Sequence, residues 1–325
     1  MPGTAAKPKI GKLALAALLV MELAKRLGFA SSLFRFVLRS RILSPRIKRR
    51  AFRGFEPDER DVFVATYAKS GTNWMMQIAQ QVAYLGDAEF DHIHQWVSWP
   101  DSPGANPVPL SDTSARDAAP TGLRIIKTHL EPEFVPYCEK ATYLTVIRDP
   151  KEVVVSSYYF IGGAFGMLDY VGIDDWFELF MQPNGVADTW AAHTAGYWSW
   201  RHRANVEVFD FGEVKREPER CIQRVAGVMG VELDHAQFAK VSERASFEYM
   251  KAHESQFGPP QAPFGRRRPP TLMIRRGETG ASDELLSRTQ QAAVDRHCQR
   301  KLLALGSDFP YRERFTIVED TTPES

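Results

Sequence analysis

Short apolar runs and stretches of helical periodicity alternate along most of the chain. Four runs have the length and β-favouring composition of strands: residues 62–67, 123–129, 142–147 and 205–211. Helical spacing is predicted over residues 73–85, 150–159, 174–204, 218–229 and 283–305. The last of these helices is expected to have Ser282 as its cap and Gly306 as its stop. Strands that alternate with helices predict an α/β fold with a mostly parallel central sheet flanked by helices.

The turn after the first predicted strand has the composition of an anion-binding loop. In residues 68–72, Gly71 lets the backbone approach closely, Lys69 supplies a positive charge, and Ser70 and Thr72 add hydroxyl donors. A helix begins next, so its amino end would add N–H groups and a positive dipole. The order differs from the G-x-x-x-x-G-K-[ST] loop of nucleoside triphosphatases, because the lysine precedes the glycine by two positions. A solvated turn is the alternative that these few residues leave open.

Two further strand ends carry charged or titratable side chains. Lys127 and His129 are alternate residues of an extended run, so their side chains share a face. A neighbouring lysine favours the neutral imidazole, which suits a general base, although a core or exposed histidine is the commoner fate of such a residue. Arg148 follows the strand 142–147, and Ser156 lies two helical turns further on, so the two can converge on one anion. A salt bridge from Arg148 to a neighbouring acid is the alternative.

Composition places the chain among ordinary globular proteins, with one marked asymmetry of charge. Of its 325 residues 44% are hydrophobic and 25% charged, and the net charge is +1. Residues 1–53 hold 13 Lys and Arg but one acid, a net charge of +12, whereas the remainder has a net charge of −11. Three scattered cysteines offer no disulfide framework or metal spacing, which suits a reducing, cytoplasmic location. No metal site is expected.

The basic segment divides the chain into an arm at residues 1–53, a domain at 54–315 and a tail at 316–325. Its apolar run at 13–21 is too short to span a bilayer, which needs ~20 residues. The arm is expected either to lie on an anionic membrane as a peripheral helix or to pack on the domain with its basic face in water. A nucleic-acid partner is not expected. Residues 98–122 and 258–270, rich in proline, glycine and polar residues, are expected to be surface loops.

Four segments together resemble the sulfotransferases that use 3′-phosphoadenosine 5′-phosphosulfate (PAPS), most nearly the soluble, cytosolic type. The resemblance runs from about Asp61 to Leu305 and rests on the order and spacing of residues 67–74, 127–130, 148–156 and 275–277. It implies the sulfotransferase fold, which is like that of P-loop kinases, and PAPS as a co-substrate with no metal.

The resemblance also implies a role for each matching residue. The loop Lys69, Ser70, Gly71 and Thr72, with Asn73, would hold the 5′-phosphosulfate, and Lys69 would reach the oxygen that bridges sulfur and phosphorus. Trp74 and Phe211 would lie against adenine. The 3′-phosphate would be bound by Arg148, Ser156, Arg275, Arg276 and Gly277. His129 would accept the proton of the acceptor hydroxyl, and Lys127 would help to hold the sulfonate oxygens.

The sequence departs from the family pattern at several places. Ala68 stands where proline is usual, Phe211 where tyrosine is frequent, and Gly280-Ala281-Ser282 where G-D-W is usual. The dimer segment of animal members is not recognisable. An apolar alcohol, phenol or lipid is the expected acceptor, because the region 174–204 is rich in aromatic residues. The alternatives are a nucleotide or small-molecule kinase on a related phosphate-binding loop, and a non-catalytic nucleotide-binding protein at the membrane periphery.

Overall fold

The predicted α/β fold is confirmed by a parallel sheet at the centre of the structure, which is a computed structural model. It describes residues 19–20, 22–37, 44–102, 108–164, 168, 171–258 and 280–319. Within these residues the sheet has four strands in the order β2-β1-β3-β4, and every neighbouring pair is parallel. The strands are β1 (Asp61–Ala65), β2 (Arg124–Thr128), β3 (Thr142–Ile147) and β4 (Val206–Asp210). All four therefore end at the same edge, where ligands bind in open α/β sheets.

Side chains of the central strands are buried on both faces, which explains their unbroken apolar sequences. Val62 and Val64 of β1 pack into one hydrophobic cluster, with residues of α4 (Thr72–Ala83) and α10 (Pro218–Val228). Phe63 and Ala65 point the other way, into a second cluster. Alternate residues of one strand thus build two cores, as the period of an extended chain requires.

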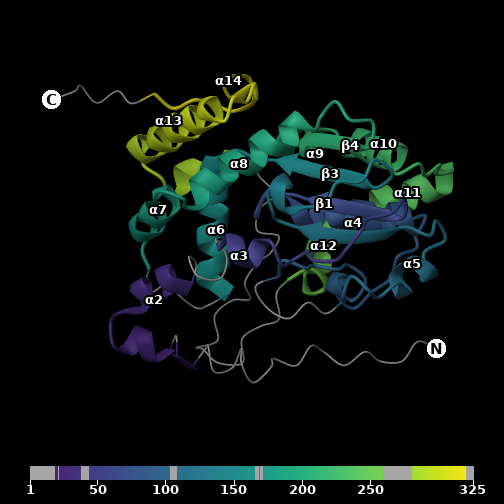
Figure 1. The fold of residues 1–325 in the computed structure, drawn as a ribbon, viewed down its shortest axis with the longest axis horizontal. Coiled ribbons are helices and arrows are strands. Elements are labelled where there is room, and N and C mark those ends of the chain that lie inside the picture. The colour runs from purple at the N-terminus through teal and green to yellow at the C-terminus, as the bar shows by residue number, and fades with distance from the viewer. Residues whose placement is uncertain are drawn as a thin grey trace.

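The remaining helices lie around this sheet. Figure 1 shows α6, α7, α8 and α13 on the left of the view and α5, α10 and α11 on the right. The helices not yet given are α2 (Ala30–Val37), α3 (Pro45–Lys48), α5 (Ser114–Ala118), α6 (Pro150–Ala164), α7 (Ile173–Met181), α8 (Val186–Ser199), α9 (Phe211–Arg216), α11 (His235–Arg244), α12 (Phe247–Ala252), α13 (Arg288–Ala304) and α14 (Tyr311–Arg314). Short 3-10 turns occur at Ile93–Gln95, Pro132–Phe134, Glu254–Gln256 and Ala281–Glu284.

Several sequence-based expectations were wrong in detail; the helical stretch 174–204, for example, is interrupted at residues 182–185 between α7 and α8. The helix expected from residue 283 begins at Arg288, because Ser287 forms the capping box with Gln290, and Ser282 opens no α-helix. The fourth strand stops at Asp210, whose carboxylate accepts the N–H groups of Gly212 and Glu213 and so starts α9 at Phe211. The stretch 98–122 is not loop throughout, since it contains α5.

The end of the basic arm is anchored on the domain. Lys48 of α3 forms a buried ion pair with Glu131 at 2.6 Å, and Phe52 packs against Phe63 in the second cluster. In the part of the chain that the structure describes, no helix is both long and apolar enough to cross a membrane.

Candidate active site

The loop after β1 is a tight turn held by its own backbone and by a hydroxyl pair. Lys69 and Gly71 both have left-handed backbone conformations, with φ of 68° and 94°. The hydroxyl oxygens of Thr66 and Thr72 lie 2.5 Å apart. Ser70 is fully buried, and its Oγ has no hydrogen-bond partner among the described residues. Because buried hydroxyls are nearly always hydrogen-bonded, this group fits a site that an anion completes.

Gly71 is expected to be essential to this turn. Replacing it with alanine forces a side chain into the left-handed region, which costs roughly 1–2 kcal/mol of the free energy of unfolding. The new Cβ would also lie 3.0 Å from Cδ2 of Phe211. The control is Gly230→Ala, at φ 66° with no heavy atom within 4 Å of the new Cβ. Urea unfolding should show a larger loss for Gly71→Ala than for Gly230→Ala, and equal losses would contradict the close packing of the turn.

Lys69 lies in an unusual environment for an ammonium group. Burial, and the nearby positive charges of Arg148 and Lys127, lower the pKa of Lys69 to about 7. Its Nζ lies 4.0 Å from the ring centroid of Phe160 on α6. A bound anion would stabilise the protonated form of this lysine, because a nearby negative charge favours the charged state.

His129 lies just past the end of β2 with its ring fixed in one tautomer. Its Nδ1 lies 2.8 Å from the carbonyl oxygen of Thr66, an acceptor, so Nδ1 carries the proton and donates it. Burial, and then the charges of Lys127 and Lys69, lower the pKa of His129 to about 3. The ring is therefore neutral at ordinary pH, with Nε2 as an acceptor. That is the state required of a general base.

Lys127 and three residues that the sequence did not assign to the site surround this histidine. The Nζ of Lys127 lies 3.4 Å from the ring centroid of Trp99 and 3.4 Å from Nε2 of His94. Trp99 contacts the His129 ring edge to face, and Asp101 accepts the backbone N–H of His129 at 2.9 Å. Burial lowers the pKa of Lys127 to about 7, although Asp101 opposes the shift. No spacing in the sequence indicated His94, Trp99 or Asp101 as residues of the site.

Arg148 forms the salt bridge to a neighbouring acid that its sequence position allowed, and its convergence with Ser156 on one anion stays a prediction. It forms an ion pair with Glu152 at 2.8 Å, and its Nη1 donates to the carbonyl of Lys69 at 3.0 Å. The other oxygen of Glu152 accepts the N–H of Gly280. The guanidinium thus connects the end of β3 with the anion-binding loop, while Ser156 is half-buried two turns along α6. Residues 275–277 lie outside the described residues.

Phe211 joins the arginine to the start of α4. Its ring lies 4.3 Å from the guanidinium carbon of Arg148, and Trp74 contacts it edge to face. Trp74 donates its Nε1–H to the carbonyl of Ala245, and Asn73 donates to that of Phe257. Apart from Ser156, which lies within α6, every sequence-predicted site residue that the structure describes lies at or just beyond the carboxyl end of a strand or at the helix start that follows it.

A buried ion pair that the sequence did not reveal fixes the start of α6. The Nζ of Lys151 lies 2.6 Å from Oδ1 of Asp295 and 3.0 Å from Oδ2 of Asp149, and both members of the first pair are at most 2% exposed. Tyr311 also donates to Asp295, at 2.7 Å. This network ties α6 to α13 and α14, so it holds Arg148 and Asp149 in place.

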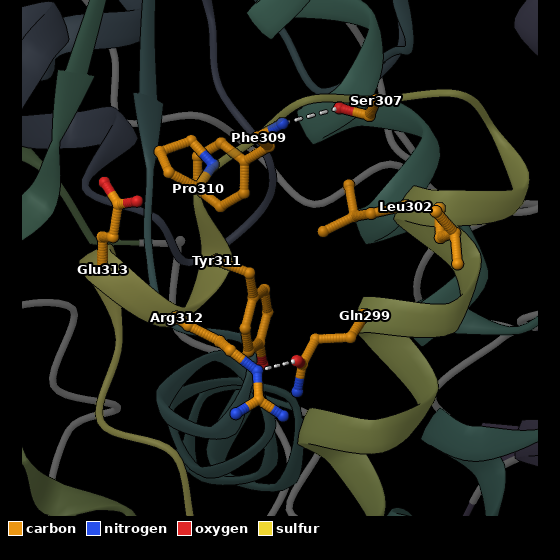
Figure 2. A pocket seen from close by; sticks show the side chains of 9 residues that line it. Gln299, Leu302, Ser307, Phe309, Pro310, Tyr311, Arg312 and Glu313 are labelled. Atoms are coloured by element: carbon orange, nitrogen blue, oxygen red, sulfur yellow. Dashed lines mark hydrogen bonds between the residues drawn. The ribbon is translucent and has the colours of Figure 1, made fainter.

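The surface carries an open pocket elsewhere, between the end of α13 and α14. Figure 2 shows Leu302, Phe309 and Tyr311 around it, with Arg312 donating to Gln299 at 3.0 Å. None of the sequence-predicted site residues lines this pocket. Among the described residues, no cluster of three or more His, Cys, Asp or Glu side chains could hold a metal ion.

Comparison with known proteins settles the family. The model of the sulfotransferase domain matches residues 59–306. The chain belongs to the sulfotransferase family. Human sulfotransferase 1C2 is 29% identical over 206 residues, which cover 61% of this chain and 68% of the relative. Sulfotransferase 2A1 of Macaca fascicularis is 25% identical over 258 residues, or 78% and 88% of the two chains.

Solved structures agree on the fold. Retinol dehydratase superposes with a TM-score of 0.62 at 18% identity, covering 82% of this chain and 88% of that one. Mouse sulfotransferase SULT7A1 gives a TM-score of 0.58 at 21% identity, with coverage of 80% and 90%. The resemblance noted in the sequence is thereby confirmed at the level of family and fold, and membership supports sulfuryl transfer in general.

Proposed function

We propose that this sulfotransferase moves the sulfuryl group of PAPS to a hydroxyl group, rather than an amine, of an apolar alcohol, phenol or lipid. The observation that carries the proposal is the convergence, at one sheet edge, of a neutral histidine, the buried Lys127 and the half-buried Lys69, and the pKa values of both lysines are lowered to about 7. A general base beside two lysines that are partly deprotonated near pH 7 suits a reaction that transfers an anionic group from a donor to an acceptor.

Different residues would serve proton transfer and charge stabilisation in this reaction. Nε2 of His129 accepts the proton as the acceptor oxygen bonds to sulfur. The bond between sulfur and the bridging oxygen breaks, and 3′,5′-diphosphoadenosine (PAP) leaves with that oxygen on its 5′-phosphate. By analogy with phosphoryl transfer, charge collects on the equatorial and leaving oxygens in line with the nucleophile. Lys69 and the loop N–H groups would meet that charge, with Lys127 at the sulfonate.

The nucleotide would be held by the groups around the anion-binding loop. The unpartnered hydroxyl of Ser70 can donate to a phosphate oxygen, and Gly71 has no side chain to keep a phosphate away from the loop backbone. Arg148 and Ser156, with Arg275, Arg276 and Gly277, would bind the 3′-phosphate, and Trp74 and Phe211 the adenine. Retinol dehydratase and mouse SULT7A1 were both crystallised with PAP, which supports the same donor here.

An apolar acceptor is supported by the aromatic surroundings of the base. Trp99 lies against His129, and Phe160 lies under the ammonium group of Lys69. Retinol dehydratase was crystallised with androsterone, and a 3-alpha-hydroxysteroid sulfotransferase of Cavia porcellus is 25% identical over 263 residues. Both names concern apolar alcohols. The membrane contact that the basic arm predicts involves a separate surface and does not enter this proposal.

Calorimetry tests the donor directly. Titration of PAP into the full chain should give saturable heat that PAPS abolishes by competition, and ATP with Mg²⁺ should give little. Radiolabelled PAPS, incubated with the protein and a set of sterols, phenols and lipids, should then label a hydroxyl. Absence of heat with PAP would overturn the donor assignment. Turnover of ATP with Mg²⁺ would favour the kinase alternative.

A further inference from the structure

The amino-terminal arm turns apolar side chains toward solvent. Of the nine large hydrophobic residues that are exposed among the described residues, six lie between residues 19 and 36. These six residues, here termed the arm face, are Leu19, Val20, Leu23, Leu27, Phe29 and Phe36, and they are 45–69% exposed. Figure 1 shows this part of the chain (purple) at the lower left edge of the molecule, beside α7. Concentrated exposed apolar surface of this kind marks an interaction site.

The arm face is the outer side of an element that is already packed on the domain. Residues 19–20 and 22–26 are helical, and Leu19, Leu23 and Leu27 recur every fourth position on one side. The other side of the arm contacts the domain through Ala24 and Ala30, which are buried in a hydrophobic cluster with residues of α6, α7 and α8. Packing on the domain was one of the two expectations for the arm, and the other, contact with an anionic membrane, stays a prediction. The arm packs on the domain and also leaves an apolar side uncovered.

Basic residues accompany the arm face. Arg26, between Leu23 and Leu27, has a side chain 75% exposed, and its Nε lies 3.8 Å from the carboxylate of Glu22. Arg35, next to Phe36, lies within 4 Å of Asp175 and Glu178 on α7. Residues 1–53 carry 13 basic residues and one acid, Glu22. A second copy of this chain would bring the same positive charge, so self-association through the arm face is opposed.

We propose that the arm face docks on an anionic lipid surface, with its apolar side chains at the level of the acyl-chain boundary and the basic residues of the arm among the headgroups. Apolar insertion and attraction to acidic lipid add in such an element, and neither is strong enough alone. The occupant has to combine an apolar interior with a negative surface, and a bilayer that contains acidic lipid does so. Docking through the arm face would not involve the carboxyl ends of the strands or the site that they form.

Vesicle sedimentation of the full chain tests the proposal. Vesicles of phosphatidylcholine with about a third phosphatidylserine should pellet the protein, vesicles of phosphatidylcholine alone should pellet much less, and raising the salt concentration should release it. The double variant Leu23→Glu/Leu27→Glu should weaken binding to the acidic vesicles at least tenfold. The matched control is Leu303→Glu on α13, where the leucine is 78% exposed, more than either arm residue, and this variant should bind as the wild type does.

Two outcomes would overturn the inference. One is failure of the wild-type chain to pellet with acidic vesicles, and the other is equal pelleting by the double variant. Circular dichroism and thermal unfolding of both variants should match the wild type, because the substituted positions are exposed. Gel filtration tests the rival explanation, self-association. If the wild type is a dimer and the double variant is a monomer, the arm face is an interface between two copies of the chain instead. Sedimentation does not depend on sulfuryl transfer, so its result is separate from that of the donor titration.

Discussion

Replacing His129 with alanine should lower kcat for sulfuryl transfer by about 10²–10⁴-fold, the usual contribution of a positioned general base. The neutral ring, with Nδ1–H fixed on the carbonyl of Thr66, provides one free acceptor nitrogen. Alanine removes that acceptor, so the attacking hydroxyl keeps its proton. Steady-state kinetics with PAPS and an acceptor identified by labelling give the measurement. Affinity for PAP should change little, because the base contacts the acceptor.

The control for this prediction is His202→Ala, which removes an exposed imidazole. Its kinetics should match the wild type. A His129→Ala enzyme that retains full kcat while binding PAP normally would remove the histidine from the mechanism. Loss of PAP binding together with activity would point to a collapsed site instead, and thermal unfolding would distinguish that case.

The pH dependence follows from the same shifts in pKa. The pKa of His129 is lowered to about 3, so the base is neutral throughout the range from pH 5 to 9 and no acid limb near pH 6.5 is expected. The pKa values of Lys69 and Lys127 are about 7, so both lose charge as the pH rises through neutrality. kcat/KM for the donor, which reports the free enzyme, should therefore fall above pH 7. kcat should persist to higher pH, because bound anion favours the protonated lysines.

The sequence predicted those parts of the fold whose cause is local. The strand at 142–147 could be placed to the residue because it is buried on both faces and is followed directly by the charged Arg148 and Asp149. Lys69, Ser70 and Gly71 were recognisable because a turn between a strand and a helix start concentrates N–H groups at one point. Arg148 and His129 were found by the same reasoning, as polar residues at strand ends.

Long-range contacts account for what the sequence did not reveal. Asp101 reaches the N–H of His129 across 28 residues, and Lys151 reaches Asp295 across 144. Nothing in the spacing of either pair indicates the contact, because it depends on how the strands and helices are arranged. The start of α13 was misplaced for a related reason. Ser282 and Ser287 both suit a helix cap, and only Ser287 has glutamine three residues later to complete the capping box.

Substituting Lys69 with methionine should lower kcat/KM for PAPS by about 10²–10³-fold, the typical cost of removing one preorganised donor to a developing oxyanion. Methionine keeps an unbranched apolar side chain beside Phe160 while it removes the charge. The variant should fold at least as stably as the wild type, since burial already disfavours the charge of Lys69. Steady-state kinetics with PAPS, and urea unfolding, check the two expectations.

A second reading of the same variant separates an electrostatic role from a structural one. The charge of Lys69 is one cause of the lowered pKa of His129, so its removal should raise that pKa, as followed by NMR of the ring. The rise should be partial, because burial and Lys127 are the larger causes and both remain. Lys140→Met, which removes an exposed lysine, should change neither the pKa of His129 nor the kinetics. A Lys69→Met enzyme with wild-type kcat/KM would show that the loop lysine does not meet the leaving group. If the rate falls while the pKa of His129 stays unchanged, Lys69 lies further from His129 than it does in the structure.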